Sequence, residues 1–386
     1  MQVCIRAVVV TGWCIRTVAV CNRAVVFLIG SGQRTARTIG FWVGWDLALD
    51  LNQKKKNSEH LKIRLSDITF ATDNFSDANR IGVTGSVNLY KAELEYFDKL
   101  NPSYVEGENE VGQPKRRNTV IVKRILASDD KKEGEIFFME LEMLTTCKHP
   151  NIVTLVGFCD EGSEMILVIE HASNGDLDDM YDSNNKHKKD GSVLTWAKRL
   201  KICLDIARGL KYLHYQMEGQ KRIINCDIRS KNILLDENWG AKIANFEVSE
   251  FLPLNKDDDA LHLDYVSGTP SYRDPEYEET HRLKRESDVY SFGLVLFEVL
   301  SGEVNKTSLD KFIKLAYKCI AETQDQCPTM NTVVHELEHM LLLQEEDQIF
   351  DEVQHKSPQT DRRHFSQTDC HVSRPTVDVA VILLTW

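Results

Sequence analysis

One short stretch, from Ile223 to Asp236, limits more than any other what this chain can fold into. An apolar pair leads into it and an apolar run leads out, so we expect both ends to be anchored in a core. Between these anchors stand a carboxylate, Asp227, and a carboxamide, Asn232. The pattern predicts a short loop that presents a proton acceptor and an amide able to bind a metal ion.

Composition excludes several classes of function. The 386 residues are enough to bury a sizeable core. The formal net charge of −12 argues against nucleic-acid binding, which needs a basic face. The ten cysteines show no paired spacing, so they predict a reduced, intracellular protein. No uncharged apolar window of about 18 residues occurs, and we therefore expect no membrane span.

Residues 1–56 form an atypical leader, for which we expect disorder. Before the first acid, Asp46, the leader carries only basic charges: Arg6, Arg16, Arg23, Arg34 and Arg37. Organelle transit peptides share this composition, but serine is scarce and the apolar pattern is that of strands. A targeting role and a leader without a role both remain open.

The segment Ile81–Ala92 has the order strand, glycine turn, strand. Gly82 and Gly85 would let backbone amides approach phosphate groups, because no Cβ stands in the way. Alone, the segment is more simply interpreted as an ordinary hairpin. The polar residues 93–118 that follow predict a long loop.

A strand and a helix come next. Thr119–Ile125 alternates like a strand and carries Lys123, and Glu135–Leu144 has a helical pattern and carries Glu140. A lone lysine on a strand is usually solvated, so its function depends on the order of the surrounding motifs.

In order, these motifs resemble the cytosolic kinase domain of plant receptor-like serine/threonine kinases. The stretch around Asp227 and Asn232 is similar to the kinase catalytic loop, H-R-D-x-x-x-x-N. Other similar segments lie on both sides of it: Lys148–Phe158, Met165–His171, Gly268–Tyr277 and Ser287–Gly302. The resemblance implies an α+β, two-lobed fold with a small antiparallel sheet lobe and a larger helical lobe.

The resemblance also implies domain boundaries. Residues 57–172 would form the N-lobe with a preceding segment, in which Ser66 is expected to cap a short helix. Residues 173–345 would form the C-lobe, shortened after residue 302, and residues 346–386 a flexible tail.

Roles for single residues follow from the same resemblance. Asp227 would be the catalytic base and Asn232 a weak metal ligand. Lys123 would contact the phosphates of ATP, with Glu140 as its partner. ATP would be the cofactor, and a set of residues would bind it: Gly82, Gly85, Leu89, Lys123, Glu170 and Asn245.

Several positions depart from the kinase pattern. Asn225 and Cys226 replace the His and Arg of the catalytic loop. Asn245 and Glu247 replace the Asp and Gly of D-F-G. Since Mg²⁺ prefers carboxylate oxygens, the neutral Asn245 makes Mg²⁺ binding doubtful. Two unit charges ~4 Å apart interact with about 4 kcal/mol at an effective dielectric near 20. If this energy is lost in the transition state, the reaction slows by about three decades.

Two further departures concern the helical lobe. Asp274 replaces the Ala of A-P-E, and the run Gln326–Met330 lacks the arginine of the usual R-P-T-M. Glu276 therefore loses its expected partner, which costs about 3 kcal/mol unless the carboxylate is exposed or finds another partner. Asp288 is expected to tie the backbone of the catalytic loop.

Three hypotheses result. The favoured one is a pseudokinase that binds nucleotide or acts as a scaffold, and the alternative is a weakly active serine/threonine kinase. His335 and His339 match H-E-x-x-H, so a zinc peptidase is a third, although no fitting third ligand follows. The expected partners are ATP or another nucleotide and signalling proteins, with a second kinase among the candidates, but no nucleic acid. The expected location is cytoplasmic, with a peripheral place at the plasma membrane as an option.

Overall fold

The computed structural model describes residues 15–21, 24–29, 59–97, 115–126, 132–180, 194–217, 222–252, 260–300, 302–303, 306–355 and 376–377. The chain divides into two compact units, Met1–Leu61 and Lys62–Trp386. In the first unit, β1 (Ile15–Cys21) and β2 (Ala24–Ile29) form an antiparallel hairpin, in line with the strand-like pattern of the leader. The disorder expected for the rest of residues 1–56 lies outside the described residues.

The second unit contains a five-stranded antiparallel sheet of order β3-β4-β5-β7-β6. Its strands are β3 (Arg80–Thr84), β4 (Val87–Phe97), β5 (Lys115–Ile125), β6 (Leu155–Cys159) and β7 (Met165–Glu170). Side chains alternate between the two faces of a strand. On β5, Val122 therefore packs into the core under α2 (Leu65–Ala71), whereas the neighbouring Lys123 points to the opposite face.

Two local predictions for this lobe are wrong. The N-cap of α2 is Arg64, without a side-chain cap, because the helix already begins at Leu65, before Ser66. The loop predicted for residues 93–118 is also too long, since β4 continues to Phe97 and β5 begins at Lys115. The polar side chains there belong to an exposed ladder, in which Lys115 Nζ lies 3.3 Å from Glu95 Oε2.

The helix α3 (Lys132–Thr146) packs against β6 and β7, and confirms the helix expected after the lysine strand. Its Phe137 is fully buried, with its ring centroid 6.4 Å from that of Phe158 on β6. This packing fixes the face of α3 that carries Glu140.

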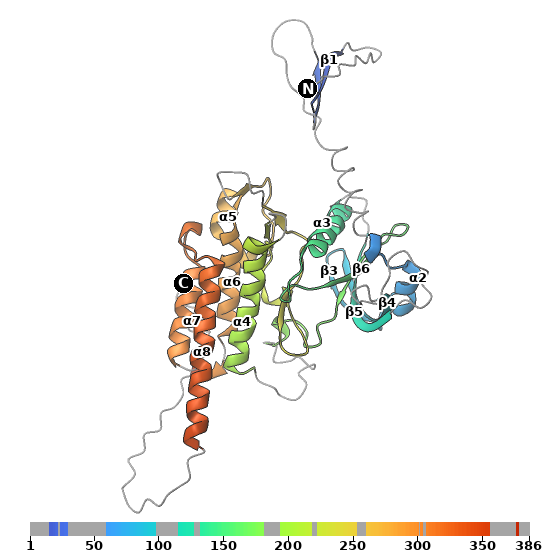
Figure 1. Cartoon of the computed structure of the whole chain (residues 1–386). Coiled ribbons are helices and arrows are strands. Elements are labelled where there is room, and N and C mark those ends of the chain that lie inside the picture. Colours follow the sequence, from blue (N-terminus) through green and yellow to red (C-terminus); the bar gives the residue numbers. More distant parts are fainter. Residues whose placement is uncertain are drawn as a thin grey trace, which may run out of the picture. The chain divides into compact units, whose positions relative to one another are not determined.

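Four long helices build the other lobe: α4 (Trp196–Lys211), α6 (Arg285–Val299), α7 (Lys306–Cys319) and α8 (Met330–His355). They lie side by side in Figure 1, with α6 buried almost all round. The helix α4 turns an apolar stripe to the core, in which Cys203, Ile206 and Leu210 are fully buried. The helix α8 continues to His355, beyond the boundary expected at residue 345.

Short strand pairs connect these helices. β8 (Ile223–Ile224) pairs with β11 (Glu250–Phe251), and β9 (Ile233–Leu235) pairs with β10 (Ala241–Ile243). Two more pairs join β12 (Leu261–His262) to β13 (Arg282–Leu283) and β14 (Gly302–Glu303) to β15 (Thr376–Val377). The α+β architecture with a sheet lobe and a helical lobe is confirmed. Among the helices of the described ranges, none has the length and apolar character of a membrane crossing.

Candidate active site

The loop that carries Asp227 is anchored as predicted. Ile223 and Ile224 in β8 and Ile233 in β9 are fully buried on its two sides. From α6, the fully buried Asp288 accepts hydrogen bonds from the backbone amides of Asn225 and Cys226, both at 2.9 Å. The expected tie between Asp288 and the loop backbone is therefore confirmed.

Both carboxylate oxygens of Asp227 are engaged. Oδ2 accepts hydrogen bonds from Asn232 Nδ2 at 2.7 Å and from Asn245 Nδ2 at 3.2 Å. Oδ1 accepts from the backbone amide of Thr269 at 3.0 Å and from its hydroxyl at 2.6 Å. Arg229 Nε lies 3.5 Å from Oδ2. These contacts hold the carboxylate in one orientation.

The two asparagines at this site are oriented by the same loop. Asn232 Nδ2 also donates to the backbone oxygen of Asp227 at 2.8 Å, so its side-chain oxygen is the group left for a cation. Asn245 has a φ of +60°, a conformation that asparagine tolerates better than most residues. Its backbone oxygen accepts from Asn225 Nδ2 at 3.0 Å, so Asn225 links the two segments although it replaces a histidine.

These residues fit a magnesium ion poorly. Asp227 is the single carboxylate of this cluster, and Asn245 turns a donor toward it. Mg²⁺ is usually bound through one or two carboxylates together with substrate phosphates. Within the described ranges, no three His, Cys, Asp or Glu side chains gather closely enough to hold a metal ion.

Lys123 lies between two carboxylates. Its Nζ is 2.6 Å from Glu140 Oε2, as the sequence predicts, and 2.7 Å from Glu247 Oε1. Burial by itself would lower the pKa of Lys123, but the charges of Glu140 and Glu247 outweigh it and raise the pKa above its ordinary value. Lys123 is thus a protonated ammonium group with two anionic partners.

The other expected nucleotide contacts lie on neighbouring strands. Gly82 pairs with Leu89, and Leu89 pairs with Lys123, so the three form one row across the sheet. Gly85 has a φ of +56° at the two-residue turn between β3 and β4. Glu170 makes other contacts. Its Oε1 accepts a hydrogen bond from the backbone amide of Thr154 and forms an ion pair with Lys242 on β10.

Comparison with known proteins decides the family. A family model described as protein tyrosine and serine/threonine kinase matches residues 103–347, which is more than half of the chain. The chain belongs to the protein kinase family.

Relatives of this kinase domain include receptor-like protein kinases of Arabidopsis thaliana. The receptor-like protein kinase HERK 1 is 34% identical over 360 residues, which cover 81% of this chain and 39% of HERK 1. THESEUS 1 is 35% identical over 318 residues, which cover 72% of this chain and 34% of THESEUS 1. ANXUR2 is 33% identical over 349 residues, which cover 76% of this chain and 36% of ANXUR2. The resemblance to plant receptor-like kinases is confirmed, and the chain spans little more than a third of these relatives.

The kinase domain compensates for the missing R-P-T-M arginine. Glu276 Oε2 accepts a hydrogen bond from the backbone amide of Gln324 at 2.8 Å, so this carboxylate has a new partner. The side chain of Gln324, 2% exposed, donates to Asp274 Oδ2, which also accepts from Ser287. Asp274 caps α5 (Pro275–Thr280) as well. The two departures from the kinase pattern therefore complement each other.

Sequence reasoning missed two contacts at this site. Thr269 binds Asp227 from 42 residues away, and no local pattern marks such a contact. The pairing of Glu247 with Lys123 did have a signal, because a carboxylate here replaces a glycine two residues after Asn245. The zinc hypothesis gains nothing from His339, whose Nδ1 lies 3.2 Å from Lys311 Nζ.

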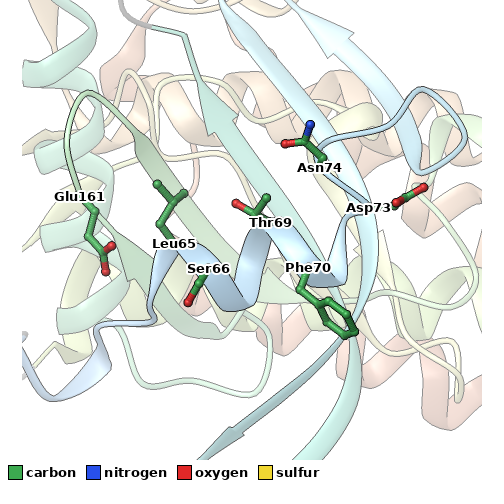
Figure 2. Close-up of a pocket in the computed structure, with 7 residues that line it drawn as sticks. All are labelled: Leu65, Ser66, Thr69, Phe70, Asp73, Asn74 and Glu161. Carbon is green, nitrogen blue, oxygen red and sulfur yellow. The ribbon is translucent and has the colours of Figure 1, made fainter.

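A surface hollow of about 720 Å³ lies beside α2, apart from all the predicted site residues. Figure 2 shows the residues that line it: Leu65, Ser66, Thr69 and Phe70 of α2, Asp73 and Asn74 after it, and Glu161. Phe70 is 90% exposed. The hollow is thus a feature of the outer face of the N-lobe.

Proposed function

We propose that this protein kinase domain is catalytically impaired and acts mainly by binding nucleotide or other signalling proteins. The observation that carries the proposal is the hydrogen bond from Asn245 Nδ2 to Asp227 Oδ2. At the position where kinases present a metal-binding carboxylate, this chain presents an amide that donates to the catalytic aspartate.

Electrostatics supports the proposal. Phosphoryl transfer depends largely on positioning and on neutralising developing charge with metal ions. Loss of one carboxylate charge at ~4 Å from the metal is worth about 4 kcal/mol, or about three decades in rate. The engagement of Lys123 by Glu247 weakens the phosphate contact as well.

A weakly active serine/threonine kinase is the second candidate. Asp227 would be the catalytic base, because it is ordered by Asn232 and Thr269. The pair of Lys123 and Glu140 is formed, which active kinases require. In this case Asn232 and Asn245 would bind the metal ion through their amide oxygens.

Membership of the kinase family implies a site for ATP, and Mg²⁺ binding is the doubtful part. We further propose the division into a leader (1–56), an N-lobe (57–172), a C-lobe that extends to the end of α8 (173–355) and a tail (356–386). Protein partners in signalling, a second kinase among them, and a cytoplasmic place near the plasma membrane belong to the same proposal.

The test is a phosphotransfer assay with labelled ATP and either Mg²⁺ or Mn²⁺. Wild-type protein is compared with an Asp227→Asn variant, which removes the candidate base. We expect the wild type to incorporate no more label than the Asp227→Asn variant. Label incorporated by the wild type and lost in Asp227→Asn would establish the weakly active kinase instead.

A further inference from the structure

Glu247 forms a contact that a nucleotide phosphate would otherwise make. Its Oε1 lies 2.7 Å from Lys123 Nζ, while Glu140 Oε2 lies 2.6 Å from the same atom. The side chain of Glu247 is 24% exposed, against 4% for Glu140. Glu247 is therefore the solvent-facing partner of the lysine, and Glu140 is the buried one.

The charges around Lys123 do not favour an anion. One ammonium group faces two carboxylates, so this cluster of three has a formal charge of −1. Asp227, which accepts a hydrogen bond from Asn245 two residues before Glu247, is a further carboxylate of the candidate site. A triphosphate that enters must displace Glu247 from Lys123 or remain beside an uncompensated negative charge.

The rest of the expected site is free of this obstacle. Gly82 and Leu89 lie in the same row across the sheet as Lys123, and neither takes part in the ion pairs. The side chain of Leu89 is apolar and only partly buried, so a contact with it does not depend on the charge of the lysine. An uncharged ligand therefore loses nothing through Glu247.

We propose that Glu247 is a specificity-determining residue that makes the candidate nucleotide site favour an uncharged purine nucleoside over ATP. The proposal rests on the proposed function in that it uses the same nucleotide site, and it assigns the ligand class of that site. Lys123 keeps its position in the fold, but the carboxylate of Glu247 makes the contact that a phosphate group would make.

The test is calorimetric titration of the full chain with adenosine and, separately, with ATP in the absence of divalent metal. We expect the wild type to bind adenosine at least tenfold more tightly than ATP. Glu247→Gln, which keeps the shape and removes the charge, should raise the ATP affinity at least tenfold and change the adenosine affinity less than twofold. Glu247→Gly should behave like Glu247→Gln.

Glu237→Gln is the matched control, since it removes the same charge from an exposed position on another segment. It should alter neither affinity. Equal binding of ATP and adenosine to the wild type, or no effect of either Glu247 variant on ATP, would overturn the proposal. So would the failure of both ligands to bind the wild type. If a variant does not fold, the ratio of the adenosine affinity to the ATP affinity of the wild type still tests the proposal.

Failure of the proposed function has a different signature. Asp227-dependent label transfer by the wild type refutes catalytic impairment, whereas the ratio of adenosine to ATP affinity measures the role of Glu247. The two results can be obtained independently on the same preparation.

Discussion

Asp288 is the residue on which the geometry of the catalytic loop depends most. It is fully buried and accepts hydrogen bonds from the backbone amides of Asn225 and Cys226, while its Oδ2 lies 2.8 Å from His214 Nε2. Buried donors that lose their acceptor pay the full cost of desolvation. The loop therefore retains its shape even though Asn225 and Cys226 differ from the kinase pattern.

Replacing Asp288 with alanine should lower the free energy of unfolding by about 3 kcal/mol or more, because two backbone amides lose their partner inside the core. Urea denaturation followed by circular dichroism measures this. Asp264→Ala, at an exposed position, is the control and should have little effect. Equal stability of the two variants would contradict the assigned role of Asp288.

Asp176 offers a test of burial at the residue scale. Burial raises the pKa of this carboxyl to about 6, although the backbone amide of Asp179 donates to it at 2.9 Å. A raised folded-state pKa means that the folded protein binds the proton more tightly. The contribution of Asp176 to the free energy of unfolding is therefore fully present below the unfolded-state pKa. It is lost as the pH rises through about 6.

We expect Asp176→Asn to stabilise the protein at pH 8 by about 1 kcal/mol, a value reduced for partial solvent screening. The gain should vanish below about pH 4, where the wild-type carboxyl is also neutral. Thermal unfolding at the two pH values measures the difference. A gain that is independent of pH would point to packing instead of charge.

At the scale of elements, α5 and the segment around Gln324 are joined by a network that replaces an ion pair. Gln324 bonds to Asp274 and Ser287 through its side chain and to Glu276 through its backbone. The network fixes the start of α5 at Asp274. It thereby also fixes the end of the preceding segment, in which Thr269 contacts Asp227.

Removing the side chain of Gln324 should therefore destabilise the helical lobe. We expect Gln324→Ala to cost about 2 kcal/mol, because Asp274 loses a buried donor. Gln326→Ala, two residues away and exposed, should cost much less. Chemical denaturation of both variants provides the comparison, and similar losses would show that the network adds little.

Element positions follow from sequence periodicity better than element lengths do. The helix with Glu140 and the strand with Lys123 were predictable because apolar spacing reports burial. The extension of β4 to Phe97 was not, because an exposed polar ladder has the composition of a loop. At the site, Asn232 and Asp227 lie close in sequence and were predictable, whereas Thr269 reaches Asp227 through tertiary packing alone.

At the scale of the molecule, Lys62–Trp386 forms a compact unit of its own. Its sheet lobe is closed by α2, whose Ile68 is fully buried against the strands. The kinase domain thus contains the elements needed for its own core.

A chain without residues 1–56 should consequently unfold at a midpoint within about 2 °C of the full chain. Differential scanning calorimetry of both proteins measures this. A clearly lower midpoint for the shorter chain would mean that the leader stabilises the kinase domain, and the proposed boundary would have to move.

If Asn245 limits catalysis, a carboxylate restored at position 245 should restore phosphate transfer. Asn245→Asp restores the carboxylate at the metal site, so Mg²⁺-dependent transfer of labelled phosphate should rise at least about tenfold above the wild type. Adding Asp227→Asn should abolish that gain. A wild type that already transfers phosphate at the rate of the Asn245→Asp variant would show that Asn245 does not limit catalysis.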